Sequence, residues 1–297
     1  MARKERWGKT HEDKRNWKEY NEHLIKRGEF YINPRFLKEW LKEIREMNRR
    51  KVGQPYTYPD SMIQFLAIIK QKGFDYRSLE GIVRVLSRKF GPFPIISFSQ
   101  IRRRILKLKT VFRKKGKKIT AGIDGTGIKV SNRGEWMRQK WDVRRGWIKV
   151  TLLGDDEGNV IDVIVGNEES DEREDARELL EENNEDISKA LMDGLHDCGD
   201  TFDKCKEFGI EPAIKIRKNA FPKGIGARSK EVRKYQKLGY EKWAKEKDYG
   251  MRWVATEGVF SAVKRIFGES VQSHKKENMY REARLKFWAY QQLRDVN

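Results

Sequence analysis

The sequence predicts an α/β protein, with a helical N-terminal part followed from about residue 119 by a mixed five-stranded sheet and its helices. Apolar and alternating runs of strand length recur after residue 118, and helical periodicity lies before, between and after them. Glycine-containing breaks such as Asp-Gly end several of these runs. The resulting order, β-β-β-α-β-α-β-α, predicts an RNase H-like core.

The individual elements follow from the same patterns. Five strands are predicted, at residues 119–124, at 127–131 together with 147–153 as one broken strand, and at 160–165, 189–192 and 211–216. The first three form an antiparallel meander. Helices are predicted from residue 170, where Ser170 is the candidate N-cap, and at 200–208, 229–247, around Glu257 and at 277–293. These elements predict a catalytic domain spanning residues 119–297.

The N-terminal part is predicted to consist of a basic arm followed by helices. Residues 1–50 form the arm and a helix, and the apolar spacing at 34–48 indicates a core helix. Residues 51–118 contain three short helices separated by tight breaks, which begin near residue 60, near Ser78 and near either Ser97 or Ser99. Three short helices so arranged fit a helix-turn-helix-like DNA-binding domain.

The charge distribution indicates a polyanionic partner. The net charge is +20, and residues 1–118 carry 32 Lys and Arg against 12 Asp and Glu. Residues 155–186 reverse this balance, with 15 acids and 2 bases, so the acidic helix there should lie away from DNA. Residues 101–118 hold ten bases and no acid. Double-stranded DNA is the expected partner.

Within this run the last predicted helix supplies candidate DNA contacts. They are Arg102, Arg103, Arg104, Lys107 and Lys109. The alternative is that the run is a solvated linker with no direct DNA contact.

Other classes are disfavoured by composition. No apolar run is long enough to cross a bilayer, and the N-terminus lacks the apolar stretch of a signal peptide. Cys198 and Cys205 fit neither a zinc site nor a disulfide framework. We therefore expect a cytoplasmic, nucleoid-associated protein without a membrane partner.

Three carboxylates are candidates for a metal site. In ITAGIDGTGIKV, a strand is predicted to end at Asp124, with a turn at Gly125–Gly127; the alternative is that Asp-Gly is only a turn pair. Asp193 directly follows the apolar run 190–192 and is preferred to Asp197, four residues on. Glu257 shares a polar helical stripe with Lys264, about a quarter-turn or more from an apolar stripe on the same helix.

Such a set suits phosphodiester chemistry. Three carboxylates can hold two divalent ions, which activate a nucleophile and stabilise a leaving oxygen. Hard ions prefer oxygen ligands, so Mg²⁺ is the expected cofactor, with Mn²⁺ as a substitute. Trp136, Trp141 and Trp147 are expected to pack in a loop and its neighbouring strand, although one of them could stack on an extruded base.

These motifs resemble those of the DDE transposases of bacterial and archaeal insertion sequences, in the grouping of families four and five. GIDGTGIKV resembles the first-aspartate motif, MDGLHDCGDTFDKCKEFGIEPAIKIRKNA the second, and RWVATEGVFSAVKRIFG the glutamate motif. The helical segments WKEYNEHLIKRGEF and GQPYTYPDSMIQFL are similar to the N-terminal module. The resemblance covers nearly the whole chain and implies the catalytic triad Asp124, Asp193 and Glu257.

The family also has a Tyr-Arg-Glu-Lys signature with gaps of two, three and six residues. Tyr249, Arg252, Glu257 and Lys264 are similar to it, but the gap between Arg252 and Glu257 is four. The resemblance implies that Arg252 and Lys264 hold phosphates, with Tyr249 among the DNA-binding residues. The longer gap puts the role of Arg252 in doubt.

The resemblance implies cut-and-paste transposition. The substrates would be terminal inverted repeats and target DNA, with the protein a homodimer on DNA. Two other classes stay open, namely a nuclease or junction resolvase of the same fold and a DNA-binding protein with an inactive core.

Overall fold

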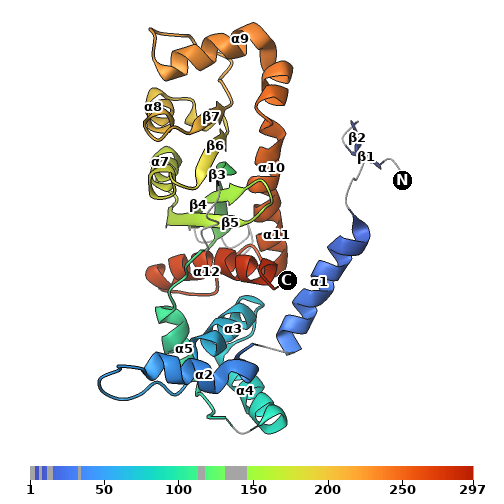
Figure 1. Ribbon diagram of the computed structural model, residues 1–297, viewed down its shortest axis with the longest axis vertical. Helices are drawn as coiled ribbons and strands as arrows, with labels where there is room; N and C mark the ends of the chain where they lie inside the picture. The colour runs from blue at the N-terminus through green and yellow to red at the C-terminus, as the bar shows by residue number, and fades with distance from the viewer. Residues whose placement is uncertain are drawn as a thin grey trace, which may run out of the picture.

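The protein is described by a computed structural model in which a central sheet lies between helices, with a helical part below it (Figure 1). The structure describes residues 4–6, 9–11, 16–32, 35–91, 93–112, 118–130 and 146–296. Trp136 and Trp141 lie outside these residues.

The sheet has five strands in the order β5-β4-β3-β6-β7. They are β3 (Ile119–Lys129), β4 (Trp147–Asp155), β5 (Val160–Asn167), β6 (Ile187–Met192) and β7 (Glu211–Ile214). β3, β4 and β5 are antiparallel neighbours, while β6 runs parallel to β3 and β7 parallel to β6. The predicted α/β class with a mixed five-stranded sheet is confirmed.

The predicted turn at Gly125–Gly127 is wrong. β3 runs through these residues without a break and stays paired with β4, Asp124 opposite Leu152 and Gly127 opposite Lys149. The glycines serve close packing instead. A Cβ on Gly125 would collide with the Glu172 carboxylate, and one on Gly127 would lie 2.6 Å from the Trp147 ring. Here the missing side chain makes room for a neighbour, and no turn conformation is needed.

Helices cover both faces of the sheet. α7 (Glu172–Glu182) and α8 (Gly199–Glu207) pack on one face, and α10 (Arg252–Ala255), α11 (Glu257–Phe267) and α12 (Lys276–Arg294) on the other. α9 (Ala227–Glu246) lies beyond β7, at the end of the molecule away from the helical part (Figure 1). The N-cap of α7 is Asp171, which accepts the N–H of Arg173, and so the assignment of Ser170 is corrected.

The N-terminal part contains five helices within the described ranges. They are α1 (Trp17–Ile32), α2 (Phe36–Asn48), α3 (Asp60–Gln71), α4 (Tyr76–Phe90) and α5 (Phe98–Lys107). Two short antiparallel strands, β1 (Lys4–Arg6) and β2 (Lys9–His11), precede them. The Asp75 carboxylate caps α4 by accepting the N–H groups of Arg77 and Ser78, which satisfies donors that the first turn leaves unpaired.

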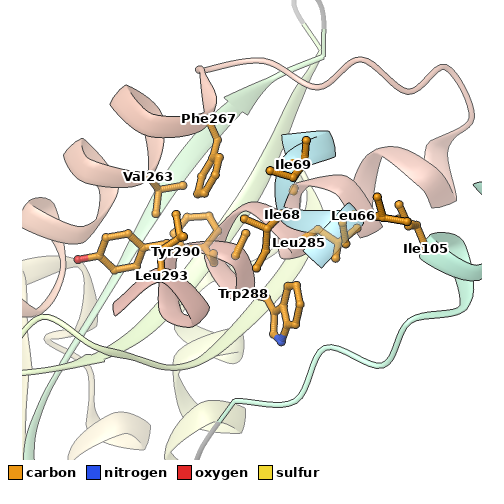
Figure 2. Close-up of a cluster of buried hydrophobic side chains, with 14 of the residues drawn as sticks. Leu66, Ile68, Ile69, Ile105, Val263, Phe267, Leu285, Trp288, Tyr290 and Leu293 are labelled. Carbon is orange, nitrogen blue, oxygen red and sulfur yellow. The ribbon is translucent and has the colours of Figure 1, made fainter. Parts of the chain in front are cut away.

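One apolar core joins the helical part to the sheet. Leu66, Ile68 and Ile69 of α3 face side chains of α11 and α12 such as Phe267, Leu285 and Trp288 (Figure 2). This cluster crosses residue 118, where the sequence predicts a domain boundary, and that division remains a prediction. In the described part of the chain, no helix has the length and apolar character needed to cross a membrane.

Candidate active site

Asp124 and Asp193 lie side by side in the topology of the sheet. The last β3–β6 pair is Ile123 with Met192, so each aspartate is the next residue on its own chain segment. β6 ends there, and the helical turn η1 (Gly194–His196) follows, while β3 continues in its pairing with β4. Side chains alternate along a strand, and Ile123 packs on the α7 face. Asp124 therefore points to the opposite face, where α10 and α11 lie.

Two glycines let α10 approach that face closely. A Cβ on Gly122 of β3 would lie 2.6 Å from Ala255 Cβ, and one on Gly154 of β4 would collide with the Ala255 carbonyl oxygen. α10 is thus in direct contact with the backbone of the two central strands. This contact fixes the start of α11, and with it Glu257, beside Asp124.

Arg252 bridges two of the three candidate acids. Its Nη1 donates to Asp124 Oδ2 (2.6 Å) and its Nη2 to Glu257 Oε1 (2.7 Å). The side chains of Arg252 and Asp124 are each 18% exposed, and that of Glu257 is 47% exposed. Charge-assisted hydrogen bonds of this kind are among the strongest in proteins. The family resemblance implies that Arg252 binds a phosphate, whereas in this structure its guanidinium bonds Asp124 and Glu257.

A break between two helices makes this bridge geometrically feasible. Residues five apart on one continuous α-helix point about 140° away from each other. Thr256, between α10 and α11, has φ −124° and ψ −72°, outside the helical region. The break at Thr256 lets the side chains of Arg252 and Glu257 point toward the same place. On one continuous helix, the extra residue between them would make the two side chains diverge.

The electrostatics of Asp124 reflect a crowded acidic site. Burial raises the pKa of its carboxyl, and the charges of Asp193 and Glu172 raise it further, while Arg252 and the N–H of Gly125 oppose them. Glu172, at the start of α7, was not identified by sequence analysis. Its carboxylate reaches the site through its charge on Asp124 and its contact with Gly125, and no motif spacing in the sequence relates it to either residue.

The structure separates the two candidates for the second acid. The buried carboxylate of Asp197 accepts two hydrogen bonds from Arg228 (2.6 and 3.0 Å) and the N–H of Arg217 (3.0 Å). Asp193 instead accepts one N–H, from Leu195 (2.8 Å). Asp197 is therefore held in a structural ion pair, and the geometry favours Asp193 as the second acid.

Lys264 and Tyr249 occupy different environments. Lys264 is half-buried, burial lowers its pKa, and its Nζ donates to Thr126 Oγ1 (2.7 Å), two residues beyond Asp124 on β3. Tyr249 is buried, donates its hydroxyl to the Met192 carbonyl (3.1 Å) and packs on Trp243. The structure thus places Lys264 at Thr126, on the same face of β3 as Asp124, with Glu269 and Lys129 as its charged neighbours. Tyr249 supports the end of β6, and its burial argues against the DNA contact predicted for it.

The candidate DNA contacts of the helical part lie on and just after α5. Arg102, Arg103, Lys107 and Lys109 are exposed. Arg104 is half-buried and stacks on the Tyr58 ring at 5.2 Å, which gives it a packing role as well. The structure brings none of these residues to the acid cluster.

The donor atoms at this site are carboxylate oxygens. Within the described residues, no three His, Cys, Asp or Glu side chains are arranged so as to hold a metal ion. The Arg252 guanidinium, however, takes the place of a cation between Asp124 and Glu257. Two carboxylates that share one cation offer the oxygen ligands that hard divalent ions prefer, so these residues fit such an ion.

Comparisons with known proteins show the family of this chain. A family model described as "Transposase DDE domain" matches residues 115–291, more than half of the chain, and a second model with the same description matches residues 25–133. The chain therefore belongs to the DDE transposase family. It is a metal-dependent enzyme of DNA transposition, a form of DNA recombination.

One solved structure is also similar, the "Crystal structure of a pre-cleavage Mos1 transpososome". It shares 11% identity, with 97% of this chain and 81% of that chain covered. The TM-score is 0.22, which establishes no common fold.

Proposed function

We propose that this transposase cuts DNA at the terminal inverted repeats of an insertion element and joins the freed 3′-OH ends to target DNA. The observation that carries the proposal is the meeting of the middle of β3, the end of β6 and the start of α11, with Asp124, Asp193 and Glu257 as the acids of the DDE motif. The strand order and directions support an RNase H-like core. The reaction takes place in the cytoplasm, at the nucleoid, and the chain acts as a homodimer on DNA.

The three carboxylates would hold Mg²⁺, or Mn²⁺ in its place. When bound, the ions supply Lewis acidity to the scissile phosphate and lower the pKa of the attacking water. Lys264, held beside β3 by Thr126, is placed to contact a phosphate as a point charge. The protein otherwise contributes position and charge, with no covalent protein intermediate.

The test of this proposal uses a duplex that carries one element end. Incubation with Mg²⁺ should give a nick that leaves a 3′-OH, followed by products joined to a second duplex. Hydrolysis without joining would favour a nuclease or resolvase of the same fold. Binding without cleavage would favour a DNA-binding protein with an inactive core. Short inverted repeats in the DNA that flanks the coding region would support transposition independently.

Lys264→Ala should lower cleavage and strand transfer about tenfold or more, because one charged hydrogen bond to the phosphate is lost. Lys264→Arg should retain part of the activity, since a charge contact survives. Arg265→Ala, an exposed neighbour on α11, is the matched control. Rates are compared on an end-containing duplex, with melting temperatures measured alongside. Wild-type rates for Lys264→Ala would make Lys264 a structural residue that only bonds Thr126.

The helical part is proposed to bind the element ends through α5, in a helix-turn-helix-like manner. Replacing Arg102 and Arg103 by alanine should weaken end binding and reduce the slope of log K against log salt by about two. The double variant Arg177→Ala/Lys206→Ala removes the same charge from the acidic α7–α8 side and should change neither quantity. Fluorescence anisotropy at several salt concentrations measures both. An unchanged slope for the α5 variant would make residues 101–118 a solvated linker.

A further inference from the structure

The strongest unexplained feature of the site is the position of Arg252. Its guanidinium contacts Asp124 and Glu257 at 2.6 and 2.7 Å, and these are two of the three acids that the proposed function assigns to metal ions. A metal ion bound to the same two carboxylates would lie close to the guanidinium, and the two positive charges would repel each other at this range. Arg252 and a metal ion therefore compete for the same ligands.

The surroundings of Arg252 keep the side chain near the site even when it leaves the acids. It belongs to α10, which Gly122 and Gly154 hold tightly against β3 and β4. Its guanidinium also lies over the Tyr249 ring, 6.0 Å from the centroid, and the Tyr249 hydroxyl is bonded to the Met192 carbonyl. A planar cation over an aromatic face gains cation–π attraction. This contact with the ring does not depend on the two acids, so it remains available to the guanidinium when the bonds to the acids break.

We propose that Arg252 is an exchangeable counter-ion of the active site. Without metal, its guanidinium neutralises Asp124 and Glu257 and keeps the two acids together across the α10–α11 break. When the acids take up divalent ions, the guanidinium is released and becomes available to a DNA phosphate. This inference rests on the proposed function, because it takes the same acids to be metal ligands.

The exchange explains two facts together. The acids are close to each other, and burial and neighbouring acids raise the pKa of Asp124, so unneutralised carboxylates here would repel one another. The gap between Arg252 and Glu257 is one residue longer than in the family signature, and the break at Thr256 makes this spacing fit a bridge between the two acids. The bridge thus keeps the acids paired until metal arrives.

Mn²⁺ binding to the full-length protein without DNA tests the exchange. Removing the competing cation in Arg252→Ala should tighten Mn²⁺ binding about tenfold or more, as expected when two charged hydrogen bonds no longer have to be broken. In chelator, Arg252→Ala should melt below the wild type. Saturating Mn²⁺ should close most of this difference, because a ligand that binds only the folded state stabilises it more when it binds more tightly.

The matched control is Arg284→Ala on α12. Arg284 pairs with Asp162 (3.0 Å) away from the site, so its loss should lower the melting temperature equally with and without Mn²⁺ and leave Mn²⁺ affinity unchanged. If Arg252→Ala does not fold, Arg252→Lys carries the test, since one ammonium cannot bridge both acids as the guanidinium does. That variant should show a smaller gain in Mn²⁺ affinity.

The outcomes are distinct. Equal or weaker Mn²⁺ binding by the Arg252 variants, with the wild type binding normally, overturns the exchange and leaves the metal site intact. No Mn²⁺ binding by either protein overturns the assignment of the acids as metal ligands, and the exchange with it. Tighter binding that Asp124→Asn abolishes supports both.

Discussion

Asp124→Asn, Asp193→Asn and Glu257→Gln are each expected to abolish DNA cleavage, with rates falling about 10³-fold or more, because the acids act as one unit. Folding should survive. Asp124 is largely buried and its pKa is raised by burial, so a neutral amide of the same shape removes a charge that the site disfavours. Cleavage of an end-containing duplex in Mg²⁺, alongside melting temperatures, measures both effects.

Asp197→Asn is the control that separates the two candidate second acids. It breaks a buried carboxylate–arginine pair, so it should lower stability by about 3 kcal/mol. Cleavage by Asp197→Asn should fall only in proportion to the fraction of protein that is unfolded. If Asp197→Asn were folded and inactive while Asp193→Asn still cut DNA, Asp197 would be the second acid.

Gly154→Ala is expected to lower the free energy of unfolding by about 3 kcal/mol, at the upper end for overpacking. The added Cβ would collide with the Ala255 carbonyl, which is backbone and cannot move aside as a side chain can. The strain should push α10 away from the sheet. Arg252 and Glu257 would then lose their positions beside Asp124, so activity should fall further than stability does, since a displacement of about 1 Å can cost about 100-fold in rate.

The control for this substitution is Gly81→Ala on α4. A Cβ there meets nothing within 4 Å, and alanine should stabilise the helix by up to about 1 kcal/mol. Urea denaturation gives both free energies of unfolding, and cleavage is assayed where each variant is fully folded. A Gly154→Ala protein with wild-type stability and activity would mean that the close approach of α10 does not set the geometry of the site.

Local sequence patterns predicted most elements. The end of β6 before Asp193 and the two stripes of α11 were correct, because a short apolar run and helical periodicity report directly on burial. The course of β3 was not predictable, because Gly125 and Gly127 match a turn as well as they match a crowded strand. Only the positions of Glu172 and Trp147, distant in sequence, distinguish the two.

The acidic residues of the candidate site could be predicted from the sequence, but the residues that contact them could be predicted less well. The bridge from Arg252 depends on the break at Thr256, which no propensity marks. Tyr249 was predicted to bind DNA because it matches a family signature. Its burial comes from packing on Trp243, and the spacing of neighbouring residues in the sequence does not reveal such a contact. Contacts between distant segments decided each of these cases.

The apolar core shared by α3, α11 and α12 makes the junction between the helical part and the sheet stiff. Because the junction is stiff, the distance between α5 and the acids is fixed. A DNA end held by α5 would meet the acids at a set number of base pairs, and no hinge in this core could absorb a change in that number. Base pairs inserted between the bound sequence and the cleavage point would move the cut along the DNA, which mapping of the cleaved ends would reveal.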